Sequence, residues 1–353
     1  MAAPALDAKV REHARLVNDA IDGYLPRTDA AFARSLREYL DLGARRLRPT
    51  FAMYEPMRHV VASGGKRIRP TLCLLAAEAA GGDARDALPT AVGIEFLHTF
   101  TLVHDDIMDK ALVRRSRPTV GALWGDDVAI TVGDALFALA FEAFTSNAQV
   151  PGVDPARVLE VLRRASRVSL DLAQGQTLDL LYAKRADVTV EEYLGMIRLK
   201  TGVLLEFSLA AGAILGGAPA ADVEAVSRFG APLGVAFQIR DDLLDLVGDP
   251  AQLGKPVGGD VRTGKRTLMV AHAFEHSPDA ARLAAILDAP PEKTGDEDVR
   301  EALRILEAAG SLQHARDVAE AHLAAAKRAL ARLPGGDFGA LASVADYVLH
   351  RAA

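Results

Sequence analysis

Two segments of the 353-residue chain, 105–109 and 241–245, share the pattern DDxxD. On a helix, residues four positions apart lie on the same side, so the first and last aspartates of each segment would converge. Mg²⁺ prefers oxygen ligands and takes them from one or two carboxylates and from substrate phosphates. A solvated acidic helix face is the alternative, but apolar runs at 99–103 and 235–239 lead into the two segments and favour a metal site. The candidate ligands are Asp105, Asp106, Asp109, Asp241, Asp242 and Asp245.

Basic residues near glycines or near these aspartates could bind phosphate groups. The segment GGKRIRP at 64–70 places two glycines, which let the backbone approach an anion, before Lys66 and Arg69. A helix that begins there would add N–H donors and the positive end of its dipole. Arg114 and Arg115 closely follow the first aspartate segment, so a diphosphate could bridge metal and arginine. The alternatives are a solvated basic turn at 64–70 and salt bridges between these arginines and the same aspartates.

Other polar residues lie where a phosphate site could use them. Lys200 and Thr201 end an amphipathic stretch, and Gln238 precedes the second aspartate segment by one helical turn. A loop with spaced glycines and lysines, including Lys255 and Lys265, could close over phosphates and exclude water. A lone lysine in such a loop is otherwise a solvated side chain.

Four further polar residues interrupt apolar helical stretches. Gln176 and Asp179 would need partners if they are buried, either in the metal site or among the lysines. His98 lies two helical turns before Asp105, so we predict that it contacts a ligand. The neighbouring His104 points elsewhere on the helix, and we interpret it as structural.

Helical periodicity dominates the chain and supplies the elements that would position these residues. Asp154–Pro155 is typical of a helix start, and 189–192 has the pattern of a capping box. The one strand-like run, 128–132, also fits a helix. No change in composition marks a domain boundary, so we predict one all-α domain over 1–353, with 277–298 as a variable loop. The longer predicted helices are 88–110, 127–146, 154–183, 190–216, 220–247 and 313–333.

The composition excludes several classes of protein. With 25% charged, 50% hydrophobic and 5% aromatic residues, the chain suits neither disorder nor an all-β fold. The formal charge of −6 argues against a nucleic-acid binder, and the single Cys73 in an apolar run indicates a buried, inert thiol. We find no signal-peptide pattern, and the most apolar long stretch, 203–221, carries Glu206. We therefore expect a cytoplasmic protein without a membrane span.

Taken together, the motifs resemble those of the trans-isoprenyl diphosphate synthases, the polyprenyl synthetase family. The similarity extends from about residue 55 to 350, and the motifs keep the order and spacing of the family. One DDxxD is weakly specific, whereas an ordered series of motifs is highly specific. The motifs are GGKRIRP at 64–70, HDDIMD at 104–109, RRSRPT at 114–119, GQTLDL at 175–180, KTG at 200–202, FQIRDDLLD at 237–245 and LGKPVGGDVRTGK at 253–265.

This resemblance implies an isoprenoid-synthase-type helical bundle around a central cavity, in a homodimer that condenses isopentenyl diphosphate with allylic diphosphates. The six aspartates, with Lys200, would be catalytic and would hold three Mg²⁺ ions, with Asp179 in or near the metal shell. The allylic diphosphate would contact Arg114, Lys200, Thr201, Gln238, Lys255 and Lys265. Isopentenyl diphosphate would contact Lys66, Arg69, His98 and Arg115.

The residue types suit the chemistry of that family. Breaking the allylic C–O bond gives a carbocation and a diphosphate, whose charge metals and basic residues stabilise. No protein nucleophile is needed, and the sequence shows no Ser/His/Asp or Cys/His constellation. In the family, the released diphosphate is thought to take the proton that is lost at the end.

Product length should depend on the depth of the cavity. Phe100, five residues before Asp105, would lie below the reacting centre, with the small Thr101 beside it. A first aspartate motif without a two-residue insertion and with an aromatic residue at this position resembles that of the family's short-chain enzymes. We therefore predict geranylgeranyl diphosphate as the product. Farnesyl or longer products are alternatives, and a non-catalytic subunit of a hetero-oligomeric synthase is an alternative of another class. A terpene cyclase is disfavoured, because both aspartate segments and GGKRIRP are present. The basic segment Arg45–Arg48 has no family counterpart, and we interpret it as a solvated helix end.

Overall fold

The computed structural model describes residues 3–25, 53–248, 257–331, 341–343 and 345. This part of the chain is almost entirely helical, which confirms the predicted all-α fold. The helices of its first half are α1 (Ala3–Tyr24), α3 (Tyr54–Val61), α4 (Ile68–Ala79), η1 (Ala84–Ala87), α5 (Leu88–Met108), α6 (Val120–Trp124), α7 (Asp126–Ser146), η2 (Asn147–Gln149) and α8 (Pro155–Tyr182). Those of the second half are α9 (Val190–Ile197), η3 (Arg198–Gly202), α10 (Val203–Leu215), α11 (Ala220–Val247), α13 (Gly259–Arg262), α14 (Leu268–His276), α15 (Ala280–Leu287), η4 (Pro291–Lys293), α16 (Asp296–Ala308) and α17 (Ser311–Leu330).

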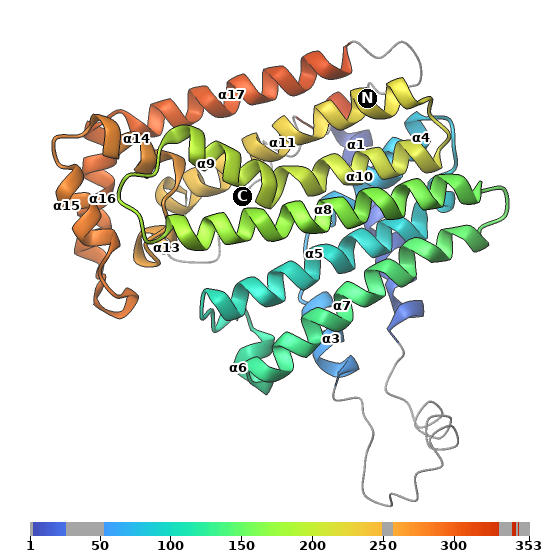
Figure 1. The fold of residues 1–353 in the computed structure, drawn as a ribbon, viewed down its shortest axis with the longest axis horizontal. Coiled ribbons are helices and arrows are strands. Elements are labelled where there is room, and N and C mark those ends of the chain that lie inside the picture. The colour runs from blue at the N-terminus through green and yellow to red at the C-terminus, as the bar shows by residue number, and fades with distance from the viewer. Residues whose placement is uncertain (1–2, 26–52, 249–256, 332–340, 344, 346–353) are drawn as a thin grey trace, which may run out of the picture.

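The long helices form one bundle (Figure 1). In it, α5 packs against α7, α10 packs against α4, α8 and α11, and α17 lies along α11. Every residue of α10 except Glu206 is buried, as expected for a helix that is hydrophobic all round. The short helices α13 to α16 gather at one end of the bundle (Figure 1).

The contact between α10 and α4 is unusually close. A Cβ at Gly212 would overlap the carbonyl oxygen of Cys73, so a larger residue cannot be placed there without moving the backbone. Cys73 itself is fully buried, and burial raises the pKa of its thiol, in agreement with the predicted inert cysteine. This contact holds α4, which begins within the basic segment 64–70, against the centre of the bundle.

Most predicted helix limits agree with the structure to within a few residues. Asp154 caps α8 by accepting a 2.9 Å hydrogen bond from the N–H of Ala156. Thr189 and Glu192 form the predicted capping box of α9. The single helix predicted over 190–216 is wrong in one respect, because the π-helix η3 separates α9 from α10. Short π-helical turns are frequent at functional sites.

Two other segments differ from the sequence predictions. The predicted variable loop, 277–298, is largely helical: it contains α15 and η4, because Leu283 and Ile286 bury against the neighbouring helices. After the first aspartate segment the chain forms an unpredicted antiparallel hairpin of β1 (Val113–Arg114) and β2 (Arg117–Pro118). Arg115 and Ser116 at its tip have φ of 52° and 59°, as in the tight turns that suit twisted hairpins.

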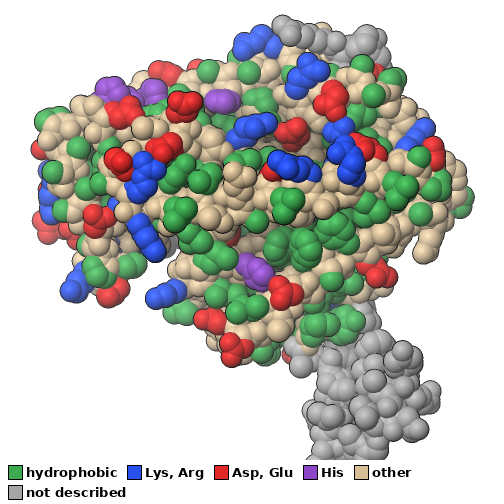
Figure 2. All heavy atoms as spheres, viewed as in Figure 1, with side chains coloured by type: hydrophobic (Ala, Val, Ile, Leu, Met, Phe, Trp, Pro, Cys, Tyr) green, Lys and Arg blue, Asp and Glu red, His purple; other side chains and the backbone are tan. Residues whose placement is uncertain are grey.

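One apolar helical stretch, Asp126–Gln149, is long enough to cross a membrane and contains an 18-residue window with a mean hydropathy of 1.6; no other helix of the described ranges meets both criteria. Its Ala129, Val132 and Leu136 are buried in the core that α7 shares with α5, as in the core helix of a bundle. Only 39% of that window is buried, however, and hydrophobic side chains gather over α7 and α8 on the face shown in Figure 2. The cytoplasmic location stays a prediction.

Candidate active site

A cavity of about 590 Å³ lies among α5, α8, η3 and α11. The C-terminal ends of α5 and α11 both reach it, so the two aspartate segments meet at one site. The structure thus brings together most of the residues selected from the sequence, although they come from distant parts of the chain. Those that line the cavity are Arg69, His98, Phe100, Thr101, Asp105, Asp109, Arg114, Arg115, Asp179, Lys200, Thr201, Gln238, Asp241, Asp242 and Lys265.

Three other predicted site residues, among those that the structure describes, do not line the cavity. Asp106 and Asp245 bind partners beside it, and Lys66 is exposed in the loop before α4. Lys255 and the Arg45–Arg48 segment lie outside the described residues.

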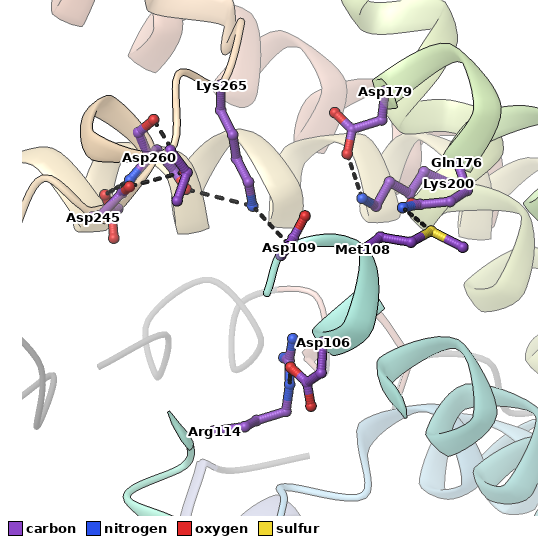
Figure 3. A network of polar contacts seen from close by, with 12 residues as sticks. Asp106, Met108, Asp109, Arg114, Gln176, Asp179, Lys200, Asp245, Asp260 and Lys265 are labelled. Carbon is purple, nitrogen blue, oxygen red and sulfur yellow. Dashed lines mark hydrogen bonds and ion pairs between the residues drawn. The ribbon is translucent and has the colours of Figure 1, made fainter. Parts of the chain in front are cut away.

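The first aspartate segment ends α5. Burial raises the pKa of Asp105, and the charge of Lys200 partly offsets that rise. Asp106 is buried and accepts a 2.7 Å hydrogen bond from Nε of Arg114 (Figure 3). This is the salt bridge that the sequence left open as an alternative, and it ties the hairpin to α5. Asp109, at the end of the helix, faces Lys265.

The second aspartate segment lies in the last turns of α11. Asp242 accepts hydrogen bonds from the hydroxyl of Tyr193 and from Nε2 of Gln238, the latter at 2.9 Å. Burial and the nearby Asp260 raise the pKa of Asp242 above its ordinary value. Asp245 accepts a 2.8 Å hydrogen bond from the backbone N–H of Asp260. The sequence patterns did not indicate Tyr193 or Asp260 as site residues. Of the two, only Asp260 carried a signal in the sequence, as an acid within a lysine-bearing loop.

Two lysines neutralise carboxylates at the cavity. Nζ of Lys265 lies 3.9 Å from Asp109 and 3.7 Å from Asp260 (Figure 3), and these carboxylates raise the pKa of Lys265. Nζ of Lys200 lies 2.5 Å from Asp179. Of the two roles that the sequence left open for Asp179, the structure shows the pairing with a lysine.

The π-helix η3 contributes two consecutive residues to the cavity, Lys200 and Thr201. The hydroxyl of Thr201 donates a 2.9 Å hydrogen bond to Oε1 of Gln238. A Cβ at Gly175 of α8 would overlap the backbone of Lys200, so glycine at this position lets α8 approach η3.

Three basic residues, Arg69, His98 and Arg115, line another part of the cavity. We call these three residues the basic rim. Nη1 of Arg69 lies 3.3 Å from Nε2 of His98. Burial, together with the neighbouring arginines, lowers the pKa of His98 well below its usual range. The imidazole is therefore neutral and accepts this hydrogen bond, because a guanidinium can only donate.

Aromatic rings close the apolar end of the cavity. Phe100 lines the cavity and packs edge to face on Phe137, with ring centroids 5.1 Å apart. Phe141 and Phe144 continue this row of rings into the core. His104 packs edge to face on Phe100, with ring centroids 5.5 Å apart, but it also lines the cavity, so the prediction that it points elsewhere is wrong.

The cavity-lining carboxylates fit Mg²⁺ as an ion shared with substrate. Within the part of the chain that the structure describes, no three Asp, Glu, His or Cys side chains form a closed metal cage. Instead, Asp105 and Asp109 line the cavity from α5, and Asp241 and Asp242 line it from α11. Mg²⁺ needs only one or two carboxylates when waters and phosphate oxygens complete its shell, so this open arrangement suits it.

Comparison with known proteins identifies the family. The sequence profile of the polyprenyl synthetase family matches residues 34–306. The chain belongs to the polyprenyl synthetase family. It is 42% identical to a short chain isoprenyl diphosphate synthase of Methanothermobacter thermautotrophicus, over 90% of this chain and 97% of that protein. It is 38% identical to a geranylgeranyl diphosphate synthase of Methanosarcina mazei, over 85% and 90%.

Solved structures of the polyprenyl synthetase family agree with this assignment. A geranylgeranyl pyrophosphate synthetase of Pyrococcus horikoshii superposes with a TM-score of 0.84 at 37% identity, covering 99% of both chains. The protein is therefore a prenyltransferase with the all-α isoprenoid synthase fold, as the motifs indicated.

Metal binding to this polyprenyl synthetase should release protons near neutral pH. Because the pKa of Asp242 is raised, the metal-free carboxyl keeps a proton that an incoming cation must displace. The affinity for Mn²⁺ should therefore rise as the pH rises towards that pKa. Calorimetric titrations in two buffers with different ionisation enthalpies measure the proton release, and Asp242→Asn should abolish that part of the heat. Identical heats in both buffers for the unmodified protein would contradict the prediction.

Proposed function

We propose that this prenyltransferase condenses isopentenyl diphosphate with allylic diphosphates and makes geranylgeranyl diphosphate as its main product. The layout of the 590 Å³ cavity carries the proposal. Carboxylates from α5, α8 and α11, with Lys200 of η3 and Lys265 from the segment after α13, surround one part of it. The basic rim forms a second part, and aromatic rings close an apolar end. The first two parts could each bind one diphosphate, and the apolar end could hold the growing hydrocarbon chain.

The aspartate side of the cavity would ionise the allylic substrate. When bound, Mg²⁺ would stabilise the negative charge that develops on the diphosphate oxygens; the family resemblance implies three such ions. Lys200 and Lys265 would exchange their carboxylate partners for the diphosphate and stabilise it as the leaving group. The metal ligands would be the cavity-lining carboxylates Asp105, Asp109, Asp241 and Asp242.

The basic rim would hold isopentenyl diphosphate beside that site. Arg69 and Arg115 would bind its diphosphate through charge-assisted hydrogen bonds. The double bond would then supply the electron pair for the new C–C bond to the allylic cation. Loss of a proton from the resulting cation restores a double bond, and we propose the released diphosphate as the acceptor.

Product analysis tests the reaction and the chain length together. The purified protein is incubated with Mg²⁺, isopentenyl diphosphate and, separately, dimethylallyl, geranyl or farnesyl diphosphate. Geranylgeranyl diphosphate should be the main product, and EDTA should abolish its formation. A farnesyl or longer main product would correct the length only. Absence of turnover with all three primers would overturn the catalytic proposal and favour the partner-subunit alternative.

We also propose that the protein is a homodimer that associates through α7 and α8. Leu159, Leu170 and Leu181 of α8 are 67%, 64% and 55% exposed. They recur every eleven residues, close to three helical turns, so they form one apolar stripe. Ile130 of α7 is 45% exposed, and Figure 2 shows the hydrophobic side chains gathered over these two helices. Exposed apolar side chains gathered on one face of a protein are typical of protein–protein interfaces.

Charged residues in this stripe should separate the dimer. The double variant Leu159→Glu/Leu170→Glu is expected to sediment as a monomer, because two carboxylates would have to be buried in the interface. Leu112→Glu is the matched control, since Leu112 is 71% exposed next to the hairpin and outside the stripe. Analytical ultracentrifugation measures all three proteins. A monomeric unmodified protein, or a dimeric double variant, would contradict the proposed interface.

A further inference from the structure

The basic rim rests on an ion pair that does not itself line the cavity. Nη1 of Arg67 lies 2.8 Å from Oε1 of Glu95, and the two side chains are only 5% and 4% exposed. Arg67 belongs to the same basic segment as Arg69, yet only Arg69 lines the cavity. The pair can therefore affect a substrate only through the residues around it.

Arg67 uses its whole guanidinium to hold the loop before α4. Besides Glu95, it donates hydrogen bonds to the carbonyl of Gly64 at 3.2 Å, to the carbonyl of Val61 at 2.7 Å and to Oδ1 of Asn18 at 2.9 Å. Lysine has neither the planar fork nor enough donors to make the same set of contacts. The backbone of Arg67 has a φ of 49°, which is unfavourable for a residue with a Cβ, so these contacts must stabilise it.

The same loop receives Arg115 from the hairpin. Nη1 of Arg115 also donates to the carbonyl of Gly64, and its guanidinium lies over Gly65. A Cβ at Gly65 would come within 2.6 Å of that nitrogen, and the φ of Gly65 is 139°. One carbonyl thus joins the buried Arg67 to an arginine that lines the cavity.

Glu95 is the buried counter-ion of this cluster. Burial raises the pKa of Glu95, while the charges of Arg67, Arg115 and Arg69 act in the opposite direction. One carboxylate among three guanidiniums leaves an excess of positive charge. This excess positive charge suits a diphosphate. It comes from Arg69 and Arg115, because the charges of Arg67 and Glu95 cancel.

We propose that Arg67 and Glu95 are positioning residues of the isopentenyl diphosphate site, which fix the loop so that Arg69 and Arg115 converge on one diphosphate. The inference rests on the proposed function of the basic rim. The pair is not expected to touch substrate, and its effect is confined to one of the two diphosphates.

Direct binding separates this role from a purely structural one. Isopentenyl diphosphate cannot react alone, so calorimetry in EDTA measures the affinity of the basic rim without turnover. Arg67→Lys keeps the positive charge but loses the planar guanidinium and its several N–H donors. It should weaken the binding of isopentenyl diphosphate about tenfold. The Tm should stay within a few degrees, and the KM for the allylic diphosphate should not change.

A second variant removes the pair without changing the net charge. In Arg67→Met/Glu95→Met both charges are lost, and apolar replacements of a buried ion pair often preserve stability. This variant should also bind isopentenyl diphosphate about tenfold more weakly, because only the geometry of the rim has changed. Glu78→Gln, which removes a carboxylate of α4 that is paired with Lys9 of α1, is the control and should bind as the unmodified protein does.

The outcomes distinguish this inference from the proposed function. The positioning role would be overturned if Arg67→Lys, or a double variant with an unchanged Tm, bound isopentenyl diphosphate as tightly as the unmodified protein does. If the double variant does not fold, Arg67→Lys decides. If the unmodified protein fails to bind isopentenyl diphosphate at all, the function proposed for the basic rim is wrong.

Discussion

Replacement of Asp105 by asparagine should lower kcat by about 10³-fold or more, which corresponds to about 4 kcal/mol of transition-state stabilisation. Asp105 lines the cavity one helical turn before Asp109, and burial already raises its pKa. A desolvated carboxylate of this kind gains most from a bound cation. Asparagine keeps the shape but not the charge, so the metal that should stabilise the leaving diphosphate would be bound poorly.

Steady-state kinetics at saturating Mg²⁺ measure this loss. Asp127→Asn is the matched control, because Asp127 is an exposed acid at the start of α7 and should be replaced without loss of activity. The affinity of the Asp105→Asn variant for isopentenyl diphosphate in EDTA should not change, since the basic rim is intact. A kcat within tenfold of the unmodified enzyme would show that Asp105 is not a metal ligand.

Replacement of Phe100 by alanine should shift the main product to a longer prenyl chain. The ring lines the apolar end of the cavity, and its removal opens space that further five-carbon units can enter. Phe137 lies directly behind it, with ring centroids 5.1 Å apart, so the extension should be limited to one or two units. The double variant Phe100→Ala/Phe137→Ala should lengthen the product again, because the next ring in the row is Phe141.

Chromatography of the dephosphorylated products measures the chain length. Thr101→Ala is the control: Thr101 also lines the cavity, but its side chain is small and its removal opens little space. An unchanged product distribution in Phe100→Ala would remove this ring as the floor of the cavity.

The part of the site that could be predicted consists of residues whose spacing carries information. The DDxxD segments determine which aspartates share a helix side, and apolar periodicity placed both segments at helix ends close to their observed positions. Ordered motifs then indicated the family, which implied that segments more than 100 residues apart would meet. Spacing along the chain alone could not have shown that α5 and α11 adjoin one cavity.

The rest depends on tertiary contacts that leave no local pattern. The sequence around Tyr193 is typical of an ordinary aromatic residue of the core. Only the tertiary fold brings its hydroxyl group to Asp242. Glu95 reads as one acid in an apolar run, and only the approach of α4 makes it the partner of Arg67. Hydrophobic periodicity cannot reveal the π-helical turn of η3. A π turn changes the backbone hydrogen-bond spacing by only one residue, and the apolar positions of an α-helix vary in sequence by as much.

Under the proposed function, the ion pairs of the cavity would also couple the binding of metal to the binding of substrate. In the protein alone, Lys200 binds Asp179, and Lys265 lies between Asp109 and Asp260. A cation that arrives alone must compete with these lysines, and an anion that arrives alone must compete with the carboxylates. When both arrive, the partners are exchanged and no charge is left unpaired. Under the proposed function, Mg²⁺ and diphosphate would therefore bind cooperatively, and linkage requires each to raise the affinity of the other by the same factor.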